Sequence, residues 1–136
     1  MTNDVIPEGF EPVIFNVPFE DRIGPIYALK QGKSLRLGLK MAKKHCNSLG
    51  IAHGGLLGTL ADIGLAWGLV IDRSDGKRAI TINLNLDYVS AAQVGDWVEV
   101  HIQPRKSHGT VGFAHCEIKN GDKLVLLANG SFKFID

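Results

Sequence analysis

The pattern of apolar positions changes midway along the chain from one continuous run to strict alternation. Between residues 54 and 71 almost every position is apolar or glycine, and Asp62 is the only ionisable residue. A run that is apolar on all sides predicts a helix at the centre of the fold. Residues 79–88 instead place apolar side chains at the even positions. This alternation predicts a half-buried strand whose odd-numbered residues, Thr81 among them, share one polar face.

Shorter alternating runs on both sides of the helix predict further strands. They cover residues 26–29, 34–39, 97–103, 110–119 and 123–134. Turns containing glycine at 31–33 and 120–122 predict hairpins, and residues 106–109 are expected to form another turn. Because short turns join neighbouring strands in antiparallel order, the sequence predicts an α+β fold. A curved antiparallel sheet of five to six strands is expected to wrap around one long helix.

Residues 1–24 do not share this periodicity. They contain prolines at 7, 12 and 18, which predict an irregular arm with a short helical turn near Phe19–Ile23. The remaining 25–136 are enough for one domain with its own core, and too few for two.

The start of the central helix combines two features that are typical of a catalytic site. Gly54 and Gly55 follow His53, so backbone N–H groups at the positive end of the helix dipole are open to a ligand oxygen. Asp62 is costly to bury without a partner. Gly55 is therefore a candidate oxyanion donor, and Asp62 a candidate base or nucleophile. The alternatives are a tight turn that needs glycine and a structural carboxylate that accepts local hydrogen bonds.

The spacing of these two residues predicts a shared site. Asp62 follows Gly55 by seven residues, which is about 10 Å along a helix axis. Catalytic contacts need a reach of roughly 3 Å, so one carbonyl group cannot touch both in the same chain. If the two residues act together, they come from different subunits related by a two-fold axis. A homodimer, or a dimer of dimers, is the expected assembly.

Composition excludes several other classes of protein. The net charge is +1 and the basic residues are scattered, so no nucleic-acid footprint is present. The histidines lack metal-ligand spacing, and neither a P-loop nor a serine-hydrolase elbow occurs, so no metal and no cofactor are expected. The two cysteines form no CxxC motif, and the start of the sequence does not resemble a signal peptide. Both features suggest the cytoplasm as the location. The apolar helix approaches the length of a membrane span, but Asp62 at its middle argues against insertion.

The motif Asn-x5-His-Gly-Gly-x6-Asp, from Asn47 to Asp62, resembles the PaaI-like acyl-CoA thioesterases of the hotdog fold. The resemblance extends over residues 24–134 and implies hydrolysis of an acyl or aryl thioester of coenzyme A to the free acid and CoA. It implies that Asn47 positions the carbonyl or water, and that Thr81 lies near the attacking water in the same subunit as Asp62. His53 either orients the loop, contacts the thioester oxygen, or is simply packed. The chain departs from the pattern at residues 90–92, where many relatives have a proline.

Further residues are expected to bind the substrate. Leu65, Ala66 and Trp67, which follow Asp62 on the helix, are expected to border the pocket for the acyl group, and Gly54 is expected to contact the substrate. Arg105 and Lys106 are expected to contact the phosphates of CoA, and His108 and Gly109 are expected to bind the substrate beside them. The alternative for the basic pair is a solvated surface. The alternative for the whole protein is a non-catalytic hotdog protein that binds or senses acyl-CoA, although Asp62 disfavours it.

Overall fold

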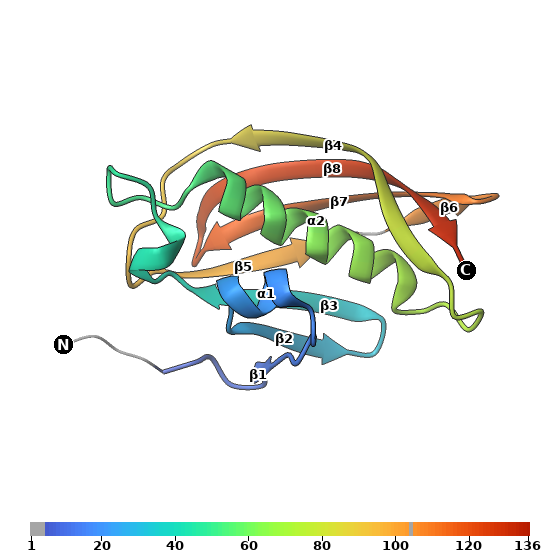
Figure 1. Cartoon of the computed structure of the whole chain (residues 1–136), viewed down its shortest axis with the longest axis horizontal. Coiled ribbons are helices and arrows are strands. Elements are labelled where there is room, and N and C mark those ends of the chain that lie inside the picture. The colour runs from blue at the N-terminus through green and yellow to red at the C-terminus, as the bar shows by residue number, and fades with distance from the viewer. Residues whose placement is uncertain (1–4, 104) are drawn as a thin grey trace.

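The computed structural model describes residues 5–103 and 105–136, and it contains one sheet and one long helix (Figure 1). The helices are α1 (Pro18–Ile23) and α2 (Gly54–Val70), with a 3-10 turn η1 (Lys43–His45). The strands are β1 (Glu11–Pro12), β2 (Ile26–Gln31), β3 (Ser34–Lys40), β4 (Arg78–Tyr88), β5 (Trp97–Ile102), β6 (Lys106–His108), β7 (Val111–Asn120) and β8 (Lys123–Ile135).

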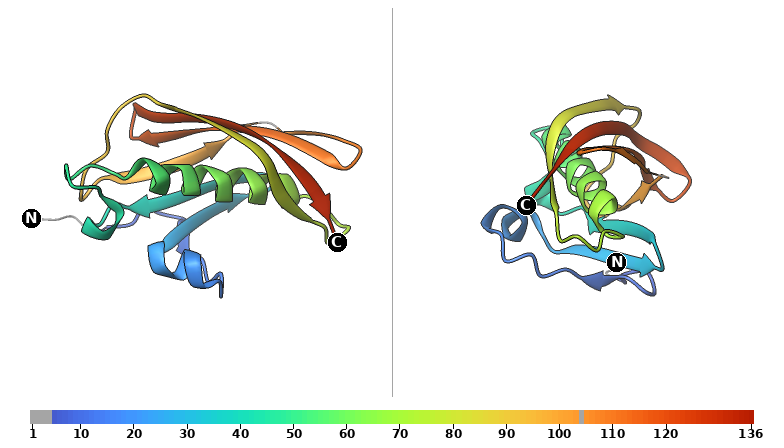
Figure 2. Two further views of the ribbon diagram at one scale, coloured as in Figure 1. Left: turned by 45° about the horizontal axis from the view of Figure 1, so that its top comes forward. Right: turned by 90° about the vertical axis from the view of Figure 1, so that its right-hand side faces the viewer.

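All strands join one antiparallel sheet in the order β1-β2-β3-β5-β7-β8-β4, with β6 beside β7. The sheet curves around α2 (Figure 2), which confirms the α+β prediction. It has eight strands, where five to six were expected. The two additions are β1, within the expected irregular arm, and β6, within the expected turn. β1 is two residues long and β6 is three residues long, so neither can show an alternating pattern. Only their pairing with β2 and β7 identifies them as strands.

Glycines let the sheet approach α2 closely. A Cβ atom on Gly58 would lie 2.9 Å from Cδ1 of Leu86, and one on Gly68 would lie 2.9 Å from Cγ2 of Ile102. The remaining helix positions contribute leucines and alanines to the core, including Leu60 and Leu65. The apolar helix is therefore central because the sheet covers it. No helix in the described part of the chain is long and apolar enough to cross a membrane.

A β-bulge in β4 changes the direction of Thr81. Thr81 pairs with Phe132 and Asn83 pairs with Ser131, so Ile82 is an extra residue without a partner on β8. The prediction that Thr81 and Asn83 share one polar face is therefore wrong. Thr81 reaches α2, whereas Asn83 lines a hollow on the outer face of the sheet. Bulges next to functional sites commonly re-aim a side chain in this way.

His45 connects α1 to the loop that precedes α2. Its Nε2 donates to the carbonyl of Ile23 at 2.5 Å, and its Nδ1 accepts from the backbone N–H of Ala42 at 2.9 Å. Its own carbonyl accepts from the N–H of His53 at 2.9 Å. Both ring nitrogens are thus used by a neutral imidazole, which is only 2% exposed. The His45 side chain therefore holds the end of α1 close to the loop that leads into α2.

We expect the free energy of unfolding to fall as the pH drops below about 6.5, in part because of His45. Burial lowers the pKa of His45 from its ordinary value of 6.5; the hydrogen bond to the Ile23 carbonyl opposes this shift in part, and the charge of Lys44 adds a smaller lowering. Below that value the unfolded chain binds more protons than the folded chain, so stability rises with pH through this window and is lost as pH falls. Burial also lowers the pKa of His101, which acts in the same direction.

Urea unfolding of His45→Gln between pH 5 and 7.5 isolates the contribution of His45. The slope of stability against pH should be shallower than in the unsubstituted protein, whereas substitution of the exposed His108 by Gln should leave the slope unchanged. Equal slopes in all three proteins would show that His45 is not held neutral.

Candidate active site

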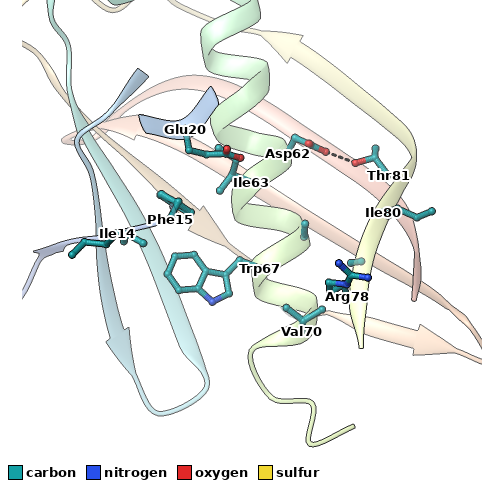
Figure 3. Close-up of a pocket in the computed structure, with 13 residues that line it drawn as sticks. Ile14, Phe15, Glu20, Asp62, Ile63, Trp67, Val70, Arg78, Ile80 and Thr81 are labelled. Carbon is teal, nitrogen blue, oxygen red and sulfur yellow. Dashed lines mark hydrogen bonds between the residues drawn. The ribbon is translucent and has the colours of Figure 1, made fainter. Parts of the chain in front are cut away.

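Asp62 and Thr81 meet where the middle of α2 faces the bulge of β4. The Thr81 hydroxyl donates to Oδ1 of Asp62 at 2.6 Å (Figure 3). Ile80, one residue earlier, points away from the helix. Asp62 is partly exposed, and its hydrogen bond to Thr81 fixes one oxygen while the other is left for a ligand. A carboxylate oriented by a hydroxyl group is suited to act as a base or a nucleophile.

A mainly apolar hollow of about 740 Å³ extends from Asp62 along α2. The N-terminal arm forms one wall and the start of β4 the other. Its lining residues are Val13, Ile14, Phe15, Glu20, Asp62, Ile63, Ala66, Trp67, Val70, Arg78, Ala79, Ile80 and Thr81. Phe15 and Trp67 contact each other edge to face, with ring centroids 6.1 Å apart. Such a surface suits an apolar or aromatic group. Ala66 lies on this hollow as expected, whereas Leu65 faces the core and has no exposed surface.

The start of α2 is organised by three side chains. Nδ1 of His53 accepts from the N–H of Gly55 at 2.9 Å, so His53 is the N-cap of the helix. The Tyr88 hydroxyl donates to the carbonyl of Gly54 at 2.5 Å. Oδ1 of Asn47 accepts from the N–H groups of Leu49 and Ile51. The Gly55 amide therefore already has an acceptor, and Asn47 keeps only its amide NH₂ for a ligand.

The expected site residues form two groups in one chain. Asn47, His53, Gly54 and Gly55 surround the start of α2, and Asp62 and Thr81 lie two helical turns further on. A second hollow, of about 450 Å³, lies between them and is lined by both Gly55 and Asp62. It meets the first hollow at four shared residues: Glu20, Asp62, Ile63 and Thr81. Together the two hollows form a groove along α2, and Asp62 lies where they join.

The expected contacts with CoA lie elsewhere. The Arg105 guanidinium binds the Asp72 carboxylate at 2.8 Å and the Lys33 carbonyl at 3.2 Å, at the C-terminal end of α2. Lys106 and His108 are exposed on β6, with Gly109 in the turn that follows. The charge of Arg105 is thus already paired, whereas Lys106 lines a hollow on the outer face of the sheet.

Sequence reasoning missed the wall of the groove that the N-terminal arm forms. Phe15 and Glu20 belong to the arm, where no periodicity marks an inward face, and only contact with α2 defines their position.

Among the described residues no three potential ligands cluster in a way that could hold a metal ion. Burial raises the pKa of Cys116 to about 12, so its thiol is not a nucleophile at neutral pH.

Comparison with known proteins identifies the family. Residues 49–126 match the model of the thioesterase superfamily. A Pseudomonas aeruginosa protein, named provisionally as an esterase, is 39% identical over 128 residues, which cover 93% of this chain and 96% of that protein. The chain belongs to the thioesterase superfamily. It is a thioester hydrolase, as the motif between Asn47 and Asp62 predicted.

More distant relatives agree with this assignment. Acyl-coenzyme A thioesterase 13 of Mus musculus is 29% identical over 120 residues, covering 87% of this thioesterase and 85% of the mouse protein. The E. coli PaaI protein, from the phenylacetic acid degradation operon, superimposes with a TM-score of 0.77 at 23% identity, covering 89% of this chain and 86% of PaaI. This likeness confirms the predicted hotdog fold.

Proposed function

We propose that this thioesterase hydrolyses an acyl or aryl thioester of coenzyme A, with Asp62 as the base or nucleophile. The observation that carries the proposal is the position of the Asp62 carboxylate, held by Thr81 at the junction of the two hollows. The larger hollow would take the acyl or aryl group against Phe15 and Trp67. The mouse relative, named an acyl-coenzyme A thioesterase, supports CoA as the thiol.

The reaction balances with one water molecule. The water oxygen forms a bond to the thioester carbonyl carbon, and Asp62 takes one of its protons when it acts as the base. The C–S bond then breaks, and the CoA sulfur leaves with a proton. When Asp62 acts as the nucleophile, its oxygen forms the first bond and water hydrolyses the resulting anhydride. Single turnover in ¹⁸O-labelled water detects the nucleophilic course in which water attacks the Asp62 side of the anhydride, because only that course leaves label in Asp62.

The oxyanion donor in this proposal is the Gly55 amide of a second copy. Strand β4 forms a sheet edge eleven residues long, and a long unpaired edge is expected to pair with another chain. Thr81 lies beside Asp62, and Tyr88 lies beside Gly54. Antiparallel pairing of two β4 strands about an axis near residues 84–85 would therefore bring Asp62 of one copy toward Gly55 of the other.

Binding of the thioester oxygen requires a change at His53. Nδ1 of this residue now accepts from the Gly55 N–H, so the proton of the neutral ring lies on Nε2. The substrate oxygen would replace Nδ1 of His53 as the acceptor of the Gly55 N–H, or both atoms would accept from that N–H. The imidazole could then donate from Nε2 to the same oxygen, in line with the sequence-based role of His53.

For the rest of the substrate, we propose that Lys106, with His108 and Gly109 beside it, contacts the CoA phosphates more readily than Arg105, whose charge is already paired.

A panel of CoA thioesters with short, long and aromatic acyl groups tests the proposal by release of free thiol. We expect turnover, with the highest kcat/KM for apolar or aryl groups that fit the hollow of about 740 Å³. The matching thioesters of a short pantetheine analogue should show higher KM at similar kcat, because they lack the phosphates. Tight binding of acyl-CoA without thiol release would instead favour the binding or sensing alternative.

A further inference from the structure

Glu20 places a second carboxylate at the junction of the two hollows. It is the third residue of α1, and its side chain lines both hollows together with Asp62 and Thr81. In Figure 3 the carboxylate of Glu20 lies beside Ile63 on the α1 side of Asp62, and Thr81 lies on the β4 side. His45 anchors the last carbonyl of α1, so the position of this helix beside α2 is fixed. Glu20 therefore belongs to the groove and not to a free surface.

One oxygen of Glu20 is without a partner. Oε2 has almost no exposed surface and no hydrogen bond, and it is the only side-chain oxygen or nitrogen in that state among the described residues. A buried carboxylate oxygen without a donor costs stability, since it loses its hydration and gains nothing in return. Such exceptions commonly mark a functional group whose partner is a ligand or a water molecule.

The two carboxylates together match the hydrogen-bonding needs of a water molecule. Thr81 occupies Oδ1 of Asp62, so the other oxygen of Asp62 is left to accept one proton of a water. The part of the Glu20 carboxylate that lines the hollows can accept the second proton. A water held by both hydrogens has its lone pairs directed away from the carboxylates, toward the space where the thioester carbon would lie.

We propose that Glu20 is a positioning residue that holds the attacking water against Asp62; this role rests on the proposed function. With Asp62 as the base, the water oxygen bonds to the carbonyl carbon and one proton passes to Asp62. The second proton stays on the former water oxygen, hydrogen-bonded to Glu20. When the C–S bond breaks, the proton on Asp62 passes to the CoA sulfur, and the acid product leaves with the second proton. Glu20 gains and loses no proton, so it contributes orientation and negative charge alone.

The test compares Glu20→Gln and Glu20→Ala with a matched control, Asp21→Asn. Asp21 is the next residue of the same helix and is exposed, so this control removes one negative charge from α1 without touching the groove. We expect kcat to fall about tenfold to a hundredfold in both Glu20 variants, the size of effect that loss of orientation produces. KM should stay close to that of the unsubstituted protein, and Asp21→Asn should change neither constant.

The stability of Glu20→Gln separates positioning from a structural role. The midpoint of its thermal unfolding should be equal or higher, because a buried carboxylate oxygen without a partner has been replaced. A residue that only anchors α1 would give a lower midpoint, and its loss would not lower kcat at constant KM.

Each outcome decides between the proposals. A protein that hydrolyses thioesters but keeps its full kcat in Glu20→Gln and Glu20→Ala contradicts the role of Glu20 and leaves the proposed function standing. A rise in KM at constant kcat contradicts it as well, because Glu20 would then contact the acyl group. If the unsubstituted protein releases no thiol from any member of the panel, the proposed function is wrong and the role of Glu20 falls with it.

Discussion

Substitution of Asp62 by Asn is expected to lower kcat by about 10²–10⁴-fold, the range that general bases and nucleophiles contribute. Asparagine keeps the shape of the side chain and can still accept from the Thr81 hydroxyl at Oδ1. It cannot take a proton from water, and it is a poor nucleophile. Because other residues make the proposed contacts with the acyl group and with CoA, KM should change far less than kcat. A large fall in kcat with little change in KM indicates loss of an interaction that is made mainly in the transition state.

The matched control is Asp122→Asn. Asp122 is an exposed carboxylate in the turn between β7 and β8, away from the residues that line the groove. It should keep the activity of the unsubstituted protein. Near-normal turnover of Asp62→Asn on the preferred thioester would show that Asp62 is structural. Acyl-CoA binding measured on the same variant would then decide whether the binding or sensing alternative is correct.

The secondary structure was largely predictable because burial imposes clear periods on this sequence. The central helix is apolar on every side because the sheet covers one side and the mainly apolar groove follows the other. Its glycines allow the close contact with Leu86 and Ile102. The strands from β2 to β8 follow alternation and turn residues, apart from β6. The elements that were missed, β1 and β6, are too short to carry a pattern and exist through pairing with β2 and β7.

The bulge in β4 was not predictable from alternation. Residues 79–88 alternate without interruption in the sequence, and the extra residue appears only when the strand is matched against β8. The sequence assigned Thr81 to the site through its resemblance to known thioesterases, while its periodicity assigned Thr81 to the opposite face. The bulge resolves the conflict, because it turns Thr81 toward Asp62. The regular pattern therefore fails at a candidate site residue, as is expected near functional sites.

The candidate site was only partly predictable, because only some of its residues break the local sequence pattern. Asp62 and the glycine pair stand out because a charge and two glycines in an apolar helix break the local pattern. Glu20 does not stand out, since a glutamate in a polar arm is ordinary until α1 packs on α2. The bond between His53 and Gly55 was also hidden, because the prediction that His53 orients the loop named no partner for its ring. The cytoplasmic location and the subunit assembly stay predictions.

Mixed dimers of Asp62→Asn and Gly55→Pro are expected to regain activity that neither parent has. Proline removes the one N–H proposed to bind the oxyanion, and it is tolerated in the first turn of a helix. Gly55→Ala is the control, since it keeps that N–H. If each site takes Gly55 from one chain and Asp62 from the other, a mixed dimer contains one intact site and one doubly damaged site. Random mixing in equal amounts makes half of the dimers mixed, so activity should reach about a quarter of that of the unsubstituted protein.

A second mixture makes the result decisive. A chain carrying both Asp62→Asn and Gly55→Pro is mixed in equal amounts with the unsubstituted chain, with subunit exchange verified by a mass tag. In a shared site every mixed dimer has two damaged sites, so only unsubstituted dimers work and activity falls to about a quarter. In a site built from one chain, each unsubstituted chain keeps its own activity and the mixture retains about half. Retention of half, with no recovery in the first mixture, would show that Gly55 and Asp62 of different chains do not form one site.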